Sequence, residues 1–166
     1  VIEASGLIVS PGGVEPHTHL AHGIMSHPET PSLTLGPEED TRGMACGGTT
    51  THIDFCYVRP GSEIMPVLEQ RAQRWKGQSH VDYAFHITLS GALPIRVSAQ
   101  MPEAIQAGHP SFKVFTTNVL PPHPKRAGNR LDFGRIGLAM EKTAQHGGIM
   151  VVHGEDEDLV QFNYER

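Results

Sequence analysis

Two histidines separated by one residue, His17 and His19, stand at the end of a run that is typical of a β-strand. Side chains of a strand alternate between its two faces, so the two imidazoles point the same way, with about 6–7 Å between their Cα atoms. Two imidazoles at this spacing can bind one metal ion, which indicates part of a metal-dependent hydrolytic site. Two ordinary polar residues at a strand terminus are the alternative that the motif alone leaves open.

Lys113 stands in the middle of an apolar run, residues 111–115. Lysine is almost never fully buried unless another group pairs with it. Burial lowers the pKa of the amine and leaves it neutral, so that it can act as a nucleophile or react with carbon dioxide to give a bridging metal ligand. An edge strand with Lys113 facing water is the alternative.

His153 ends a third run of this kind, because residues 149–152 have the pattern of a buried strand and Gly154 follows. This placement repeats that of the first pair. The chain has 11 histidines in 166 residues, a high number that is expected of a metal site but also of a histidine-rich surface.

Composition narrows the class of protein. With 166 residues, 38% hydrophobic and 19% charged, the chain can form one soluble globular domain. The net charge of −5 argues against a nucleic-acid partner, and no apolar run reaches the ~20 residues of a membrane span. Cys46 and Cys56 form neither a disulfide framework nor a zinc ribbon, so we expect a cytoplasmic protein with a small-molecule partner.

Strand-like and helix-like segments alternate along the chain. Strands are predicted at 13–20, 49–56, 81–89, 111–116 and 149–155. Helices are predicted at 37–45, 63–76, 99–107 and 133–146, with another beginning near Asp156. This regular alternation predicts parallel strands joined by right-handed crossovers, and therefore an α/β architecture.

Two α/β folds compete, the closed barrel and the open doubly wound sheet. No Gly-x-Gly-x-x-Gly motif follows the first strand, which argues against a dinucleotide-binding sheet. The candidate chemistry lies on three strands, at their C-terminal ends or facing inward, where a barrel assembles its active site. A full barrel takes about 250 residues. We therefore expect an incomplete (β/α)8 TIM-type barrel, with about the first five β/α units present.

Two long loops, residues 21–36 and 117–132, follow the first and fourth strands on the same face. Both exceed the usual length of about 2–6 residues, and long loops at this rim bind substrate or close over it. An irregular surface insertion is the alternative reading of each.

Several motifs together resemble the amidohydrolase superfamily, and within it the dihydropyrimidinase and hydantoinase branch of cyclic amidases. In chain order they are Pro11–Leu20 with the His-x-His pair, Gly47–Thr50, Asp54-Phe55, Asp82–His86, Ser111–Phe115 and Val151–Glu155. The match extends over nearly the whole chain in order, which makes it far more specific than any one motif.

This resemblance implies a binuclear zinc centre in a distorted barrel. His17 and His19 would bind the more buried ion, a carboxylated Lys113 would bridge two zinc ions, and His153 would bind the second ion. A bridging hydroxide would then open the C–N amide bond of a cyclic amide or imide of the dihydropyrimidine or hydantoin type. By the same resemblance, we expect the full-length protein to form a homo-oligomer.

The chain departs from this family in its extent. A further metal-binding histidine on the sixth strand and a general-base aspartate on the eighth have no counterpart before Arg166. Residues 1–11 resemble the tail of a flanking β-sandwich, and residues 12–166 resemble the first five β/α units. We expect an internal fragment of a longer enzyme, inactive by itself.

A second departure concerns the substrate. Hydantoinases have a substrate-binding tyrosine five residues after the carboxylated lysine, where this chain has Asn118, whose amide can still donate a hydrogen bond. Allantoinases and dihydroorotases share the metal framework and stay open as alternatives, as does a non-catalytic dihydropyrimidinase-related interaction protein. Such interaction proteins typically lose the metal-binding histidines that this chain retains, which favours an enzyme.

Three other polar residues are expected to be structural. His52 and His86 lie inside predicted strands and are interpreted as hydrogen-bonded core residues. Asp54 is interpreted as a residue that holds the structure, without an acid-base role.

Overall fold

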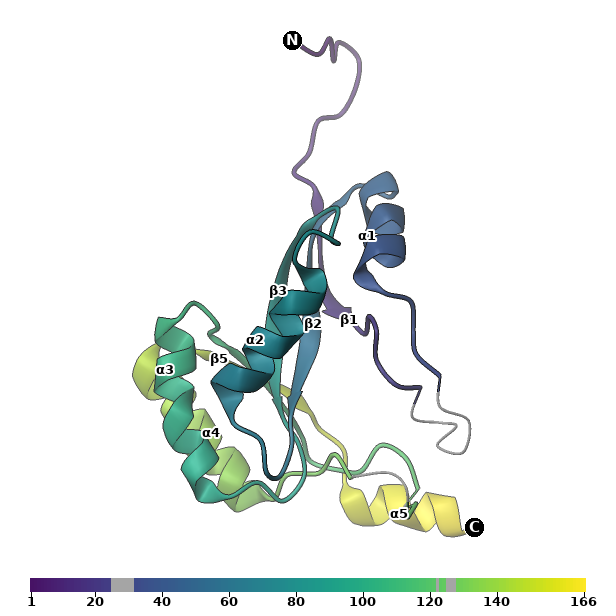
Figure 1. The fold of residues 1–166 in the computed structure, drawn as a ribbon. Coiled ribbons are helices and arrows are strands. Elements are labelled where there is room, and N and C mark those ends of the chain that lie inside the picture. Colours follow the sequence, from purple (N-terminus) through teal and green to yellow (C-terminus); the bar gives the residue numbers. More distant parts are fainter. Residues whose placement is uncertain (25–31, 122, 125–127) are drawn as a thin grey trace.

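Five parallel strands form one sheet in the order of the chain. The computed structural model describes residues 1–24, 32–121, 123–124 and 128–166. The strands are β1 (Gly13–Thr18), β2 (Thr49–Val58), β3 (Asp82–Leu89), β4 (Ser111–Phe115) and β5 (Ile149–His153). Each pairs with the next, so the sheet order is β1-β2-β3-β4-β5 (Figure 1).

Helices follow the strands and contact one another in sequence. They are α1 (Pro37–Cys46), α2 (Ile64–Trp75), the 3-10 helix η1 (Ile95–Gln100), α3 (Met101–Gln106), α4 (Phe133–His146) and α5 (Glu157–Glu165). Helices α1 to α4 form a continuous row in which each contacts the next, whereas α5 lies apart from them (Figure 1).

The sequential strand order distinguishes between the two folds considered above. A doubly wound sheet reverses its strand order at a switch point, whereas a barrel adds strands in one direction. The described sheet has no reversal. The α/β prediction is therefore confirmed, and the curled five-stranded sheet is consistent with part of a TIM barrel.

The apolar core lies between the sheet and the row of helices. Alternate residues of the central strands supply one side of it, and α2, η1, α3 and α4 supply the other. Its members include Val58, Phe85, Ile87, Phe112 and Val114 from strands, and Ile64, Leu68, Trp75, Met101 and Ala139 from helices. The opposite side of the sheet, here called the inner face, carries the intervening residues of each strand.

Local chemistry explains the boundaries of α4 and the start of α5. Asp132 caps α4 by accepting a hydrogen bond from the Arg135 N–H at 3.0 Å, and Gly147 ends that helix in the left-handed conformation, at φ 75°. Asp156 caps α5 in the same way, through the Leu159 N–H at 2.8 Å. The prediction of a helix beginning near Asp156 is therefore confirmed.

Four predicted elements differ from the structure by more than one residue. The second strand extends to Val58 instead of residue 56, and the fifth ends at His153 instead of residue 155. The first strand ends at Thr18 instead of residue 20, because the chain then turns and the Ala21 N–H donates to the Leu35 carbonyl at 2.7 Å. The helix predicted at 99–107 is η1 followed by α3. Pro102, in the first turn of α3, has no N–H to donate to an earlier turn, so the regular α-helix begins there.

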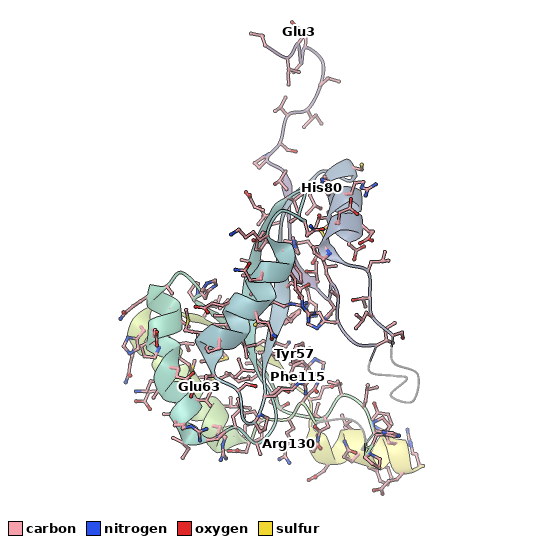
Figure 2. The ribbon with its side chains drawn as sticks, in the orientation of Figure 1. Glu3, Tyr57, Glu63, His80, Phe115 and Arg130 are labelled. Carbon is pink, nitrogen blue, oxygen red and sulfur yellow. The ribbon has the colours of Figure 1, made fainter. Side chains whose placement is uncertain are left out.

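The N-terminal residues leave the sheet and form no strand before Gly13. All of them except Ala4 are exposed, and Glu3 lies far from the sheet (Figure 2). Their assignment to a flanking β-sandwich stays a prediction. The two predicted rim loops lie partly outside the described residues, at 25–31, 122 and 125–127. None of the helices in the described ranges has the length and apolarity to cross a bilayer.

Candidate metal site

All four predicted metal ligands lie on the inner face of the sheet or at its margin. In β4, Phe112 and Val114 pack into the helix-facing core, so Lys113 and Phe115 point to the inner face. In and after β1, Thr18 and Leu20 are buried, whereas His17 and His19 are exposed on the other side. The alternation predicted for the His-x-His pair is therefore present.

Phe55 of β2 contacts three histidine rings of the inner face. Its ring centroid lies 4.6 Å from those of both His17 and His19 and 5.1 Å from that of His86. The rings of His17 and His19 are themselves 5.2 Å apart. Although part of its surface is exposed, partial burial of the His19 ring, followed by the neighbouring His22 and His17, lowers its pKa to about 4, so the imidazole is neutral at physiological pH and can bind a cation.

Lys113 is buried, with 4% of its surface exposed, and β4 lies between β3 and β5. The alternative of an edge strand facing water is therefore wrong. The ammonium nitrogen lies 5.0 Å from the centroid of the Phe115 ring, and among the described residues it has no hydrogen-bond acceptor or carboxylate partner. Burial lowers the pKa of Lys113. This shift favours the neutral form of the amine.

His153 is the last residue of β5, and its ring centroid lies 5.2 Å from that of Phe115. The Nε2 atom lies 2.6 Å from Oε2 of Glu155, which leaves Nδ1 to bind a metal. Thr116 holds this turn: its hydroxyl accepts a hydrogen bond from the Glu155 N–H at 2.8 Å and donates to the Glu155 carbonyl at 2.6 Å. Glu155 therefore orients the imidazole.

The four residues form two pairs, His17 with His19 beside Phe55, and Lys113 with His153 beside Phe115. Among the described residues, no three His, Cys, Asp or Glu side chains come together in a way that could hold a metal ion. The predicted set depends on Lys113, whose amine becomes an anionic oxygen ligand only after carboxylation. The donors present, three imidazoles and a buried amine, fit a zinc site in their chemistry.

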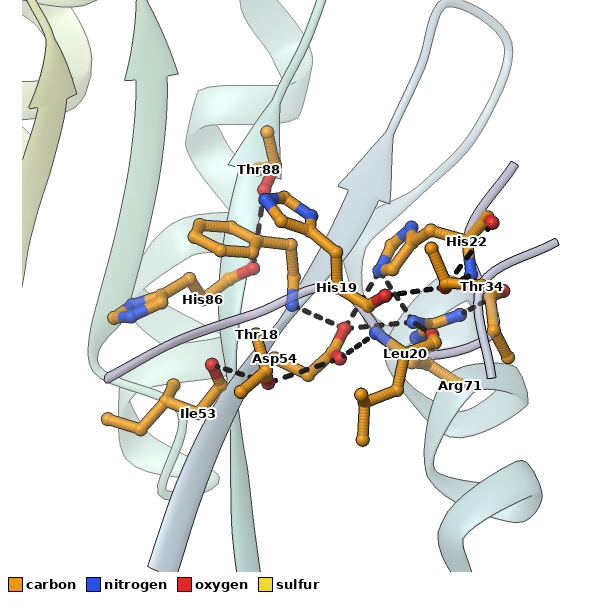
Figure 3. Close-up of polar contacts among 12 residues, drawn as sticks. Thr18, His19, Leu20, His22, Thr34, Ile53, Asp54, Arg71, His86 and Thr88 are labelled. Atoms are coloured by element: carbon orange, nitrogen blue, oxygen red, sulfur yellow. Dashed lines mark hydrogen bonds and ion pairs between the residues drawn. The ribbon is translucent and has the colours of Figure 1, made fainter. Parts of the chain in front are cut away.

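Asp54 anchors the segment that carries His19 (Figure 3). This fully buried carboxylate accepts hydrogen bonds from the Leu20 N–H at 2.7 Å and from Nη2 of Arg71 at 2.8 Å, and it lies 2.8 Å from Nε2 of His22. Burial alone would raise the pKa of Asp54, but the hydrogen bonds of His22, Leu20 and Arg71 outweigh it and hold that pKa below its ordinary value. The structural interpretation of Asp54 agrees with these contacts.

His52 and His86 are buried and hydrogen-bonded, as expected. The Trp75 indole N–H donates to Nε2 of His52 at 3.2 Å, so the proton of this neutral ring is on Nδ1, which lies 3.0 Å from the Thr18 hydroxyl. His86 lies 2.8 Å from the Pro16 carbonyl through Nε2. His52 thus faces α2, whereas His86 shares the inner face with Lys113.

Asn118 connects the loop after β4 to the first turn of α5. Its backbone N–H and Nδ2 donate to the carboxylate of Glu157, at 2.7 and 3.0 Å, and its Oδ1 accepts from the N–H groups of Asn129 and Arg130, at 2.8 and 3.1 Å. Among the described residues, Nδ2 of Asn118 has no second acceptor. Sequence reasoning missed Glu157, because no local pattern relates residues 39 positions apart.

Comparisons with known proteins agree with the resemblance that the sequence motifs predict. The chain is 31% identical to a D-hydantoinase of Geobacillus stearothermophilus over 98% of its own length and 32% of the relative's. It is 31% identical to a D-hydantoinase of Streptomyces coelicolor over 94% of its length and 31% of the relative's. No family model matches the chain.

Solved structures agree with this relationship. A D-hydantoinase from Bacillus sp. AR9 superposes with a TM-score of 0.80 at 27% identity, over 97% of this chain and 33% of the other. A dihydropyrimidinase from Brevibacillus agri shares the fold, with a TM-score of 0.77 over 93% of this chain and 31% of the other. The resemblance predicted from the motifs is confirmed, and the chain spans about a third of the length of the relatives it matches.

Proposed function

We propose that this chain supplies the first five β/α units of a metal-dependent hydrolase that opens the C–N amide bond of a cyclic amide or imide. It corresponds to about a third of the length of the D-hydantoinases that it matches. Its relatives are named for hydantoin substrates. The single observation that carries the proposal is Lys113, a buried amine without a described partner, on the same face of the sheet as His17 and His19.

Four side chains would hold the metal. His17 and His19 would hold one ion, His153 would hold the other through Nδ1, and carboxylated Lys113 would supply oxygen ligands between them. Two zinc ions held there would supply the nucleophilic hydroxide and the Lewis acid that hydrolysis of a ring amide needs. Phe55 and Phe115 border the two ligand pairs, while Glu155 orients His153.

Substrate contacts are proposed at the rim of the same face. Asn118 would have a secondary role in substrate binding. Glu157 and the loop backbone hold most of its side chain, so one amide hydrogen would be its contribution. The five described units leave one edge each of β1 and β5 unpaired in this sheet. Catalysis would therefore need further β/α units, in a full-length cytoplasmic protein that forms a homo-oligomer.

Two measurements on the full-length protein test the proposal. The first is stoichiometric zinc in protein purified without chelator, with less metal in His17→Ala and His153→Ala and unchanged metal in the control His80→Ala, which lies away from the inner face. The second is ring opening of dihydrouracil, hydantoin, allantoin and dihydroorotate. Retained metal in the first two variants would refute the ligand assignment. Inactivity on all four rings would favour another amidohydrolase substrate or a non-catalytic interaction protein.

A further inference from the structure

A hollow of about 240 Å³ lies beside His19. Its walls come from the segment after β1, through His19, His22 and Thr34, and from the end of β2, through Tyr57 and Arg59. Because His19 belongs to the candidate metal site, a substrate held there can extend from the reacting amide into this hollow. The chemistry of Tyr57 and Arg59 therefore decides which substituent fits.

Tyr57 brings a phenol to the inner face. It stands two residues after Phe55 on β2, so the two side chains share a face. Its ring centroid lies 5.4 Å from that of His22, and among the described residues its hydroxyl has no hydrogen-bond partner. Burial raises the pKa of Tyr57, which keeps the hydroxyl protonated and able to donate.

Arg59 brings a positive charge that no described acid neutralises. Its guanidinium carbon lies 5.3 Å from the centroid of the Tyr57 ring, and no hydrogen bond or ion pair joins it to the described residues. Three other arginines differ, because each pairs with an acid: Arg42 with Glu38, Arg71 with Asp54, and Arg135 with Asp132 at 2.5 Å. A guanidinium with unused donors at the wall of a hollow is suited to bind a planar anion from outside the chain.

We propose that Tyr57 and Arg59 form a subsite for a carboxylate substituent on the ring that the metal site opens. The inference rests on the proposed function and narrows its substrates to acidic cyclic amides. A carboxylate would accept hydrogen bonds from the Tyr57 hydroxyl and the Arg59 guanidinium, whereas a neutral substituent of the same shape leaves the cation without a counter-charge. Asn118 cannot take this role, because its side chain carries no charge and is held by Glu157.

A matched pair of substrates tests the subsite in the full-length protein. Hydantoin-5-acetate and hydantoin-5-acetamide have nearly the same shape and differ by one charge. We expect kcat/KM to favour the acid. Arg59→Gln should lower kcat/KM for the acid about 10- to 100-fold, mainly through KM, and leave the amide unchanged. Tyr57→Phe should have a smaller effect of the same kind. Arg96→Gln, an exposed arginine in η1, is the charge-matched control.

The outcomes separate the two proposals. If both rings open equally well and Arg59→Gln changes neither, the subsite is refuted while the proposed function stands. If neither ring opens, the proposed function fails on this substrate class, and titration calorimetry with the same two compounds then decides the subsite. Tighter binding of the acid to the wild type than to Arg59→Gln supports it, and equal binding overturns it.

Discussion

The carboxylate of Asp54 accepts a hydrogen bond from the backbone N–H of Leu20 at 2.7 Å, one residue after the candidate ligand His19. The same carboxylate lies 2.8 Å from Nη2 of Arg71, which connects β2 to α2. The position of His19 is therefore set by a buried ion pair between the sheet and a helix, although neither charge belongs to the ligand set.

Asp54→Asn should destabilise the chain strongly. The change keeps the shape of the side chain but leaves the Arg71 guanidinium, 10% exposed, without its counter-charge. Loss of one partner from a buried pair costs about 3–5 kcal/mol of the free energy of unfolding, which urea denaturation measures. Glu38→Gln, which breaks the exposed pair of Glu38 and Arg42, is the control and should cost less than about 1 kcal/mol. Equal losses would contradict a structural role for the ion pair.

The contribution of Asp54 should also depend on pH. The pKa of its carboxyl is lowered in the folded chain, so the ionised group stabilises the fold fully above the unfolded pKa of about 3.9, and this stabilisation is lost as the pH falls through the lower folded pKa. The stability difference between wild type and Asp54→Asn should be constant above about pH 5 and shrink on acidification. Repeating this measurement of stability against pH in the His22→Gln background separates the contribution of Asp54 from that of His22. A stability difference that does not change with pH down to pH 2 would refute the role assigned to the Asp54 carboxylate.

Lys113→Met should stabilise the metal-free chain and remove metal binding. The thioether side chain fills a similar volume, and it replaces an amine that is buried without a hydrogen-bond acceptor among the described residues. We expect the free energy of unfolding to rise by about 1 kcal/mol. Bound zinc, measured by atomic emission on the full-length protein, should fall. Lys76→Met, at an exposed lysine, is the control for both measurements. A destabilised Lys113→Met chain would indicate that the amine is paired or hydrated.

The two cysteines should differ in reactivity. Cys46 is exposed, whereas Cys56 is buried in the core and its burial raises the pKa of the thiol to about 12. Iodoacetamide should therefore add one label to the native chain, at Cys46, and two labels in denaturant, as counted by mass spectrometry. Rapid native labelling of Cys56 would show that β2 does not pack against the helices.

Gly128→Ala should disturb the loop that Asn118 organises. A Cβ atom at residue 128 would lie 2.5 Å from Oδ1 of Asn118, so the amide would have to move and release its bonds to the loop backbone. We expect the free energy of unfolding, measured by thermal unfolding, to fall by about 1–3 kcal/mol. Gly137→Ala, where nothing lies within 4 Å, should instead stabilise α4 by up to about 1 kcal/mol. Adding Asn118→Ala to Gly128→Ala should cost less than the sum of the two changes, since the clash is then absent.

The sequence determined the elements and the face on which each ligand lies. Helix α4 occupies the predicted residues 133–146, because the apolar spacing, the Asp132 cap and the Gly147 stop all act within a few residues of one another. The inward direction of His17, His19 and Lys113 followed from strand alternation, which is also a local property.

The tertiary structure decided what surrounds these residues. Lys113 is buried because β3 and β5 flank its strand, and Asp54 meets Arg71 across 17 positions of chain. The contact of Asn118 with Glu157 and the hollow beside Tyr57 and Arg59 likewise join separate segments. Spacing along a chain encodes the geometry of one helix or strand, whereas the partner of a charge is chosen when the apolar faces of different elements pack, and that choice leaves no periodic signal in the sequence.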